Sequence, residues 1–435
     1  MTTRIEPADV FTPTSFPLEE PSVYAARQEA ESALRRATSR DKVPIVFGEF
    51  GVGKTTLIRR FFLEAEREGR LINILSPEGK NLDDIARIAL EELDYTVTVE
   101  EQETTGSSVE GSTEIGWSGI LKARLAGRLD ESRTVKKELS VKSPTDQGFL
   151  NVLADHRVVL VIDEMHTASE GFRLQLARMI KASANLNRRF PQIVVLGTTA
   201  DAAALVAVDE GIDRLLAEIR VEPMNDDEAR FVITDGMAKL ELSISEDLVA
   251  TLIRTAAGAP ALLQEICLDT AEHAVDDSRA EIEEPDVEFA VREFLTGSRA
   301  RLTQTYVTAI ETTGPRRYRK LILRAMAESP SDFVTMDELS ERVSSYVGEP
   351  VPSTALSGPL RDLKQPRFGE ILRDVARPLE PGGRVYNLTA FKDPRLKAFI
   401  RTMPGIEDLG WLPDASEIQE LPNAVGESDD GADES

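Results

Sequence analysis

The sequence predicts an α/β fold in which helices cover both faces of a parallel sheet, followed by a helical segment and a C-terminal winged helix-turn-helix. Short runs of apolar, mostly β-branched residues at 43–47, 158–162 and 193–199 are typical of buried strands in a parallel sheet. Helical periodicity of apolar residues fills most of the sequence between these runs and continues through residues 223–297.

The composition is that of a globular protein, with 41% hydrophobic and 29% charged residues. The one cysteine, Cys267, excludes an internal disulfide framework and fits a reducing compartment. The apolar runs are far too short to span a bilayer, so we expect a cytoplasmic protein with no membrane partner. The net charge of −25 makes the chain as a whole acidic, and a nucleic-acid interface would therefore require a local basic surface.

Residues 1–22 contain several prolines and few apolar clusters, which predicts an extended N-terminal arm. A helical pattern at 23–38 follows, and the strand at 43–47 then leads into G-E-F-G-V-G-K-T at residues 48–55. A strand, a glycine-rich loop ending in Lys-Thr and a helix, in this order, predict a phosphate-binding P-loop. Residues 23–222 are therefore expected to form a P-loop αβα sandwich.

The residue types of this loop fit a nucleotide with its metal ion. Glycines let successive backbone N–H groups point at phosphates. Lys54 would reach the β- and γ-phosphates, and the Thr55 hydroxyl would hold Mg²⁺, so the predicted cofactors are ATP and Mg²⁺. The predicted nucleotide-binding residues are Gly48, Glu49, Phe50, Gly51, Val52, Gly53, Lys54, Thr55 and Thr56.

A strand at 71–75 and a helix at 81–93 continue the α/β pattern. Residues 95–143 differ in kind, because Ser, Thr, Gly and charged residues dominate them. Period-two alternation around Trp117 predicts a hairpin or a mobile insertion. Trp117 is interpreted either as part of a hairpin lying on its own domain or as a contact for a partner.

The strand at 158–162 ends in two acids, Asp163 and Glu164. Ligands bind at the carboxyl ends of the strands of a parallel sheet, so we expect both acids beside the P-loop. Asp163 would hold Mg²⁺, and Glu164 would act as the general base on the attacking water. The next strand ends in Thr198 and Thr199, either of which is a candidate contact of the γ-phosphate or the water.

The order of these motifs resembles that of AAA+ ATPases. Asp163-Glu164-Met165-His166 is similar to the D-E-x-H segment of the Orc1/Cdc6-like and TniB/ExeA-like families, and the resemblance covers roughly residues 23 to 300. It implies that Thr198 occupies the sensor-1 position. It also implies that Arg214 is an arginine finger acting in a neighbouring subunit, and hence an ATP-dependent homo-oligomer. Many of these relatives carry a sensor-2 arginine where this sequence has Ala261, so we expect slow hydrolysis or hydrolysis used as a switch.

Residues 223–297 are helical throughout, and Asn225 with Glu228 forms a helix-start signature. They predict a helical lid whose angle to the ATPase core depends on the nucleotide. Residues 298–402 predict the winged helix, with three helical patterns followed by two strands that a Gly-Gly turn connects. The run Tyr386-Asn387-Leu388 resembles the closing strand of winged-helix domains in Orc1/Cdc6-like and STAND ATPases.

Two roles for the winged helix stay open. Residues 315–402 hold sixteen basic and eleven acidic residues, a balance of +5, which favours duplex DNA as the partner. In the alternative role the module binds a partner protein and its basic residues are solvated surface. The candidate DNA contacts are Arg361, Lys364, Arg367 and Arg384.

Residues 403–435 hold ten acidic and no basic residues, which predicts a disordered acidic tail. Together these patterns predict an ATP hydrolase whose Mg-ATP state controls a winged-helix DNA-binding domain. One alternative is a STAND-like switch for signalling or defence, whose winged helix binds protein. A weaker alternative is a helper ATPase for transposition or replication.

Overall fold

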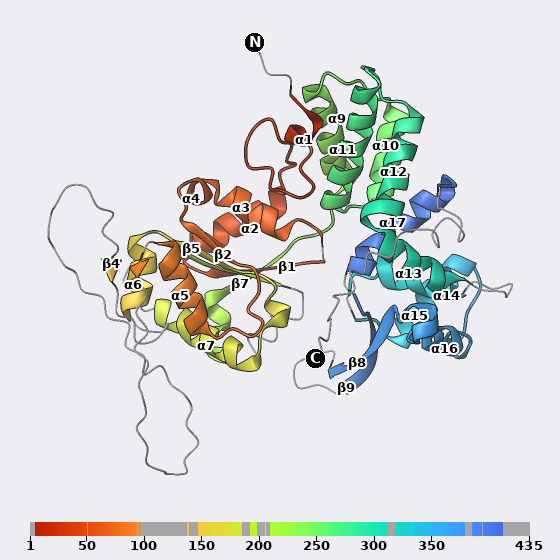
Figure 1. The fold of residues 1–435 in the computed structure, drawn as a ribbon. Coiled ribbons are helices and arrows are strands. Elements are labelled where there is room, and N and C mark those ends of the chain that lie inside the picture. Colours follow the sequence, from red (N-terminus) through yellow and green to blue (C-terminus); the bar gives the residue numbers. More distant parts are fainter. Residues whose placement is uncertain are drawn as a thin grey trace, which may run out of the picture. The chain divides into compact units, whose positions relative to one another are not determined.

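The computed structural model describes residues 5–49, 51–93, 95–96, 137–138, 147–184, 192–197, 205, 209–311, 318–331, 333–378, 385–393 and 395–411. The chain divides into two compact units (Figure 1). We call the first the sheet unit, which comprises Ser15–Glu20 and Tyr24–Pro223. The second is the helical unit, which comprises Met1–Thr14, Pro21–Val23 and Met224–Ser435.

The sheet unit is built on five parallel strands in the order β2-β5-β6-β1-β7. The strands are β1 Val43–Phe47, β2 Leu71–Ile74, β5 Val159–Ile162, β6 Gln192–Gly197 and β7 Leu216–Arg220. Helices lie on both faces of this sheet (Figure 1), as the P-loop αβα sandwich requires. The predicted fold class is therefore confirmed.

Two hydrophobic cores flank the sheet because successive strand residues point to opposite faces. In β5, Val159 and Val161 belong to one core, whereas Leu160 and Ile162 belong to the other. The first core is covered by α2 Gln28–Thr38, α3 Lys54–Phe61 and α4 Leu63–Arg67. The second core is covered by α5 Leu82–Glu92, α6 Gln147–Asp155 and α7 Glu170–Ser183.

One strand of the sheet has no counterpart in the sequence-based prediction, which gives no strand between Arg214 and the helical region 223–297. β7 forms the edge beside β1, in register from Val43 with Leu216 to Phe47 with Arg220. In the insertion, β3 Tyr95–Thr96 and β4 Lys137–Glu138 form a short parallel pair. The predicted hairpin around Trp117 lies outside the described residues.

The helical unit begins with a bundle in the region predicted as a lid. Its helices are α9 Asp226–Lys239, α10 Glu246–Ala256, α11 Pro260–Asp276 and α12 Glu284–Glu293. Asn225 and Glu228 form the predicted reciprocal cap at the start of α9. Within the described residues, no helix is long and apolar enough to cross a membrane.

The N-terminal arm is not uniformly extended, because it contains the helical turn α1 Pro7–Val10. Phe11 is fully buried, and its ring lies where a Cβ on Gly236 of α9 would be 2.4 Å away. Gln264 of α11 holds the arm at two points: it accepts from the Thr12 N–H and donates to the Val23 carbonyl. The arm is thus part of the bundle, which explains why Phe11 and Val23 are buried.

The remainder of the helical unit starts at η3 Phe294–Ser298, a π-helical turn between α12 and α13. The antiparallel pair β8–β9 follows three helices of the predicted winged helix. The elements are α13 Ala300–Ile310, α14 Tyr318–Glu328, α15 Met336–Val347, α16 Ser353–Asp362, η4 Pro366–Phe368, β8 Leu372–Pro378, β9 Val385–Phe391 and α17 Arg395–Asp408.

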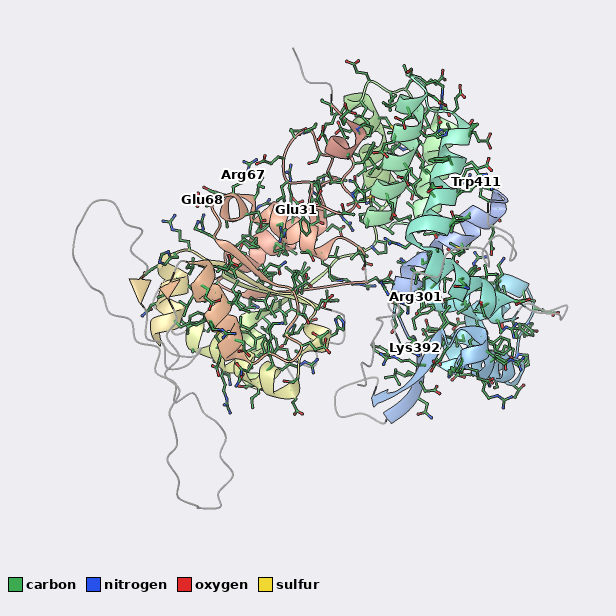
Figure 2. All side chains as sticks on the ribbon, viewed as in Figure 1. Glu31, Arg67, Glu68, Arg301, Lys392 and Trp411 are labelled. Carbon is green, nitrogen blue, oxygen red and sulfur yellow. The ribbon has the colours of Figure 1, made fainter. Side chains whose placement is uncertain are left out.

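The prediction that disorder begins at residue 403 is wrong. α17 continues to Asp408, with Met403 and Ile406 fully buried on one face. Trp411, just beyond α17 (Figure 2), is only 6% exposed. These apolar side chains supply the packing that holds the segment, whereas the prediction weighed only its charge.

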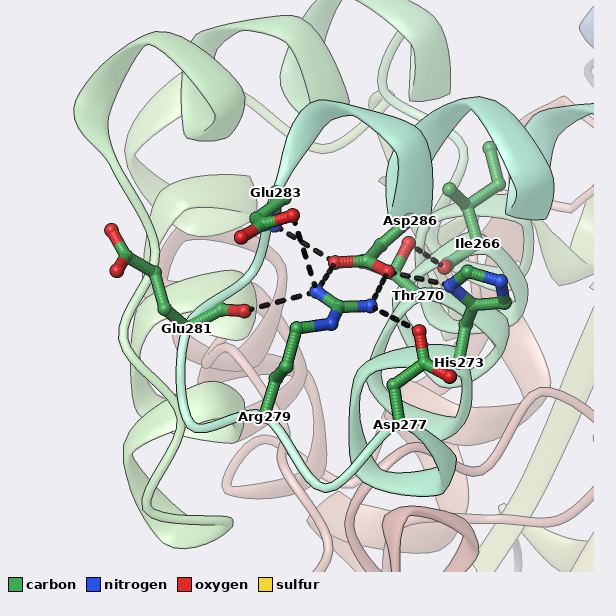
Figure 3. A network of polar contacts seen from close by, with 8 residues as sticks. All are labelled: Ile266, Thr270, His273, Asp277, Arg279, Glu281, Glu283 and Asp286. Carbon is green, nitrogen blue, oxygen red and sulfur yellow. Dashed lines mark hydrogen bonds and ion pairs between the residues drawn. The ribbon is translucent and has the colours of Figure 1, made fainter.

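A buried carboxylate fixes one end of the bundle. Asp286 is completely buried at the start of α12, and Arg279 donates to both of its oxygens at 2.6 and 2.5 Å (Figure 3). The ring of His273 lies 2.6 Å from the same carboxylate through Nδ1. Burial alone would raise the pKa of Asp286, but the hydrogen bonds from Arg279 and its other donors outweigh burial and lower the pKa from 3.8 to about 2.

Asp286→Asn is expected to lower the free energy of unfolding by about 3 kcal/mol near neutral pH, because Arg279 loses its buried charged partner. The loss should shrink as the pH falls from about 4 to about 2. The pKa is lower in the folded chain than in the unfolded chain, so the ionised carboxylate stabilises the fold above this range and protonation removes that contribution. Urea unfolding of the full chain near neutral pH and in acid measures both effects.

The matched control is Asp277→Asn. Asp277 also accepts from Arg279, at 3.1 Å, but its side chain is 62% exposed. Its replacement should cost less than about 1 kcal/mol. Equal losses for the two substitutions would contradict the importance of the buried carboxylate.

Candidate functional site

The glycines of the P-loop stand where a side chain would be strained or would not fit. Gly53, the residue before α3, has φ 89°, a left-handed conformation that glycine adopts without strain. A Cβ on Gly48 would lie 2.4 Å from the Val221 carbonyl oxygen. The chain can therefore turn sharply from β1 into α3, and the first N–H groups of α3 face the loop.

Lys54 is the first residue of α3 and lies across the loop. Its Nζ donates to the carbonyls of Gly48 and Glu49, at 3.1 and 2.8 Å. The ammonium group is thus held against the backbone of the loop. Phe50 lies outside the described residues.

Thr55 and Asp163, the two predicted Mg²⁺ ligands, come together although 108 positions separate them in the chain. The Thr55 hydroxyl donates to Asp163 Oδ2 at 2.7 Å, and Asp163 Oδ1 accepts from the Glu164 N–H at 2.7 Å. Two hard oxygen ligands side by side fit Mg²⁺, which takes one or two protein ligands and completes its shell with phosphate and water. No group of three His, Cys, Asp or Glu that could hold a metal occurs in the described part of the chain.

The sheet order explains how distant residues reach one edge. β6 lies between β1 and β5, with Phe47 paired to Gly197 and Ile162 paired to Val195. The carboxyl ends of all three strands therefore lie at the same edge as the P-loop. Thr198 follows Gly197 directly, but Thr198 and Thr199 themselves lie outside the described residues.

Glu164 and Arg214 are both exposed. Glu164 follows β5 directly, and its carboxylate makes no hydrogen bond or ion pair to any described residue. Arg214 lies in the 3-10 helix η2 Glu210–Leu215, just before edge strand β7, and its guanidinium likewise has no such partner in the described ranges. Both side chains are therefore available to a ligand or to another subunit.

Sequence reasoning missed Arg27, which is 8% exposed and lies behind the P-loop. Its guanidinium donates to the Val52 carbonyl at 3.3 Å and to the Glu222 carbonyl, so it ties the loop to the residues after β7. The prediction placed Arg27 inside a helix over 23–38, but α2 begins only at Gln28. An arginine within an alanine-rich helical pattern carries no signal of burial.

Glu31 of α2 (Figure 2) holds the segment that carries Arg27. Its carboxylate accepts from the Arg27 N–H at 3.2 Å and from the Tyr24 hydroxyl at 3.0 Å. Burial, together with the neighbouring Glu31 carboxylate, raises the pKa of Tyr24, so its hydroxyl stays a hydrogen-bond donor. This contact fixes the chain just before α2.

A sequence profile of the family described as Novel STAND NTPase 1 matches residues 14–283, more than half of the chain. The chain belongs to this family. The matched range includes the P-loop, Asp163 and most of the helical bundle. The chain is therefore a P-loop NTPase of the STAND type. A separate comparison with curated proteins found no match to its sequence.

Solved structures similar to this Novel STAND NTPase include Cdc6p from Pyrobaculum aerophilum, at 17% identity and a TM-score of 0.43, covering 93% of this chain and 99% of that one. A Walker-type ATPase of Pyrococcus abyssi is 16% identical, with a TM-score of 0.46 and coverage of 89% and 98%. The Orc1 protein of Aeropyrum pernix, solved in complex with DNA, is 16% identical, with a TM-score of 0.40 and coverage of 89% and 95%.

The four candidate DNA contacts of this Novel STAND NTPase lie in different surroundings. Arg361 is exposed on α16, and its side chain has no partner in the described part of the chain. Lys364 pairs with Asp374 of β8 at 2.5 Å, and Arg367 lies over the Phe368 ring at 4.3 Å. Arg384 lies outside the described residues. Among the described candidates, Arg361 is thus the one whose side chain makes no hydrogen bond, ion pair or ring contact with another described residue.

Proposed function

We propose that this chain is a molecular switch that binds Mg-ATP in the P-loop and hydrolyses it slowly. The observation that carries the proposal is the 2.7 Å hydrogen bond between Thr55 and Asp163, which joins the P-loop to the acidic strand end. The two residues have the chemistry and proximity that a Mg²⁺ site shared with nucleotide phosphates needs.

In the proposed reaction, Lys54 and the N–H groups at the start of α3 bind the β- and γ-phosphates. Thr55 and Asp163 would hold Mg²⁺, which when bound neutralises charge on the phosphates. Glu164 accepts a proton from the water that attacks the γ-phosphorus. The bond from that phosphorus to the bridging oxygen breaks, and ADP and inorganic phosphate leave.

Two residues are assigned supporting roles in this proposal. Thr198 would contact the γ-phosphate or the water from the end of β6. Arg214, exposed before the edge strand, would approach the nucleotide of a neighbouring subunit. An arginine supplied by a neighbouring subunit makes hydrolysis depend on assembly, as a molecular switch requires. Ala261 also fits slow hydrolysis, because it stands where many members of the families that the sequence resembles carry a sensor-2 arginine.

For the C-terminal module we propose protein binding as the output. Although basic residues are in excess over 315–402, most of its described basic side chains have an acidic partner. These pairs include Arg319–Asp362, Lys320–Glu407, Arg324–Glu328, Arg342–Glu338, Lys364–Asp374, Lys392–Glu370 and Arg395–Asp393. Phosphate binding would have to compete with these pairs.

One observation favours duplex DNA as a second candidate partner. The exposed positions of α16 include Thr354, Ser357 and Arg361, which share one face of the helix. Small hydroxyl side chains and one arginine can contact phosphates and base edges. The C-terminal module therefore stays a candidate DNA reader through α16.

The full-length Glu164→Gln protein, in which ATP should persist, separates the two outputs. Sedimentation velocity is expected to show a larger assembly with Mg-ATP than without it, and identical sedimentation would contradict the switch. The same samples, titrated with a fluorescent duplex at two salt concentrations, test the second candidate. Salt-sensitive binding that Arg361→Ala weakens would support DNA, whereas no binding in either nucleotide state would exclude it.

A further inference from the structure

The backbone of Glu164 is in an uncommon conformation. Its φ is 51° and its ψ is 42°, which is left-handed, although the residue is not glycine. Such a conformation costs roughly 1 to 3 kcal/mol and persists only where neighbouring contacts enforce it. Neighbouring contacts must therefore hold the backbone of Glu164, the residue whose carboxylate acts in the proposed reaction. We call these contacts the brace.

Thr167 supplies that brace from the next turn. Its hydroxyl donates to the Glu164 carbonyl at 2.8 Å, and its N–H donates to the same oxygen at 2.9 Å. The intervening Met165 is fully buried in the core under the sheet. The carbonyl of Glu164 is therefore held by two donors of one residue, while Met165 anchors the turn η1 Met165–Thr167.

Ser76 contacts the Thr167 hydroxyl in turn. It lies two residues beyond the end of β2, the strand next to β5. The two hydroxyl oxygens are 3.0 Å apart. A hydroxyl has one hydrogen, and Thr167 gives its hydrogen to Glu164, so Ser76 must be the donor of this bond. Ser76 is itself fixed, because Lys80 donates to its carbonyl at 2.7 Å.

We propose that Thr167 and Ser76 are positioning residues, which act through Glu164 on ATP hydrolysis. Their hydroxyls form a relay from the end of β2 to the Glu164 peptide, and the orientation of that peptide sets the direction of the carboxylate. The inference rests on the proposed function of Glu164 as the base. The relay contacts neither Lys54 nor Thr55 nor the side chain of Asp163, so we expect nucleotide binding to change much less than hydrolysis.

The test is Thr167→Val, which keeps the shape of the side chain and removes the hydroxyl. Misplacing a catalytic group by about 1 Å costs up to about a hundredfold, so kcat for ATP is expected to fall about tenfold or more. KM should change less than about twofold, since binding contacts are intact. Thr167→Ser, which restores the hydroxyl, should recover most of the rate.

Two further variants make the test specific. Thr234→Val removes a similar bond, from a threonine hydroxyl to the Arg230 carbonyl at 2.9 Å, on an exposed face of α9. It should leave kcat unchanged. Ser76→Ala should also lower kcat. The double variant Ser76→Ala/Thr167→Val should have nearly the same kcat as Thr167→Val alone, because the relay is already broken in Thr167→Val.

The outcomes distinguish this inference from the proposed function. If the unmodified chain hydrolyses ATP and Thr167→Val matches its kcat, the inference is wrong and the proposed function stands. If the unmodified chain hydrolyses no ATP, the proposed hydrolysis is wrong. Amide hydrogen exchange across residues 164–168 then tests separately whether the Thr167 hydroxyl stabilises the backbone of Glu164. Faster exchange in Thr167→Val than in Thr234→Val supports the brace, and equal exchange overturns it.

Discussion

Glu164→Gln is expected to lower the rate of ATP hydrolysis by about a hundredfold to ten-thousandfold, the usual contribution of a general base. The amide keeps the size of the side chain but cannot accept the proton of the attacking water. ATP affinity should stay within about twofold of the unmodified chain, since Lys54, Thr55 and Asp163 are untouched. Single-turnover hydrolysis and an equilibrium ATP titration measure the two quantities separately.

Glu170→Gln is the control for this substitution. Glu170 is an exposed glutamate at the start of α7, six positions further along the same segment. Its replacement should change neither quantity. Hydrolysis by Glu164→Gln at the unmodified rate would remove Glu164 from the reaction and leave the nucleotide site itself intact.

Lys54→Ala is expected to weaken ATP binding by about a hundredfold, which corresponds to about 3 kcal/mol. The Lys54 ammonium already lies at the loop, on the Gly48 and Glu49 carbonyls, and is the group proposed to bind the β- and γ-phosphates. Alanine supports the same helix start but offers no charge. Titration calorimetry with Mg-ATP measures the loss.

The parts of the fold that the sequence predicted are those that local pattern determines. The strand 43–47 was predicted with its observed bounds, because a fully apolar run lies between Lys42 and the first glycine of the loop. The meeting of Thr55 and Asp163 was predicted from a general property of parallel sheets, whose strand ends share one edge. Such rules need no knowledge of side-chain packing.

The elements that sequence reasoning missed depend on tertiary contacts. β7 is an edge strand of five residues in which only Leu216 and Ile219 are buried, so its apolar pattern is too short to predict a strand. The last turns of α17 lie in an acidic stretch and are held by burial of Met403 and Ile406. Net charge alone indicated disorder there.

The finer structure of the candidate site was also beyond prediction. Arg27 reaches Val52 across 25 positions, and Ser76 reaches Thr167 across 91. Single polar residues far apart in a chain leave no periodic pattern, and their pairing follows from the strand order. The ion pair between Lys364, a predicted DNA contact, and Asp374 likewise leaves no pattern in the sequence.

In the proposed function, the P-loop and the end of β5 form one Mg-ATP site. Calorimetric titration of Mg-ATP into the unmodified chain, Lys54→Ala and Lys42→Ala tests this site. Lys42 lies just before β1, the strand that leads into the P-loop, and donates to the Leu216 carbonyl at 3.2 Å, away from the loop. We expect one ATP per chain for the unmodified protein and for Lys42→Ala, and about a hundredfold weaker binding for Lys54→Ala. ATP binding of equal strength in all three proteins would contradict the proposed site.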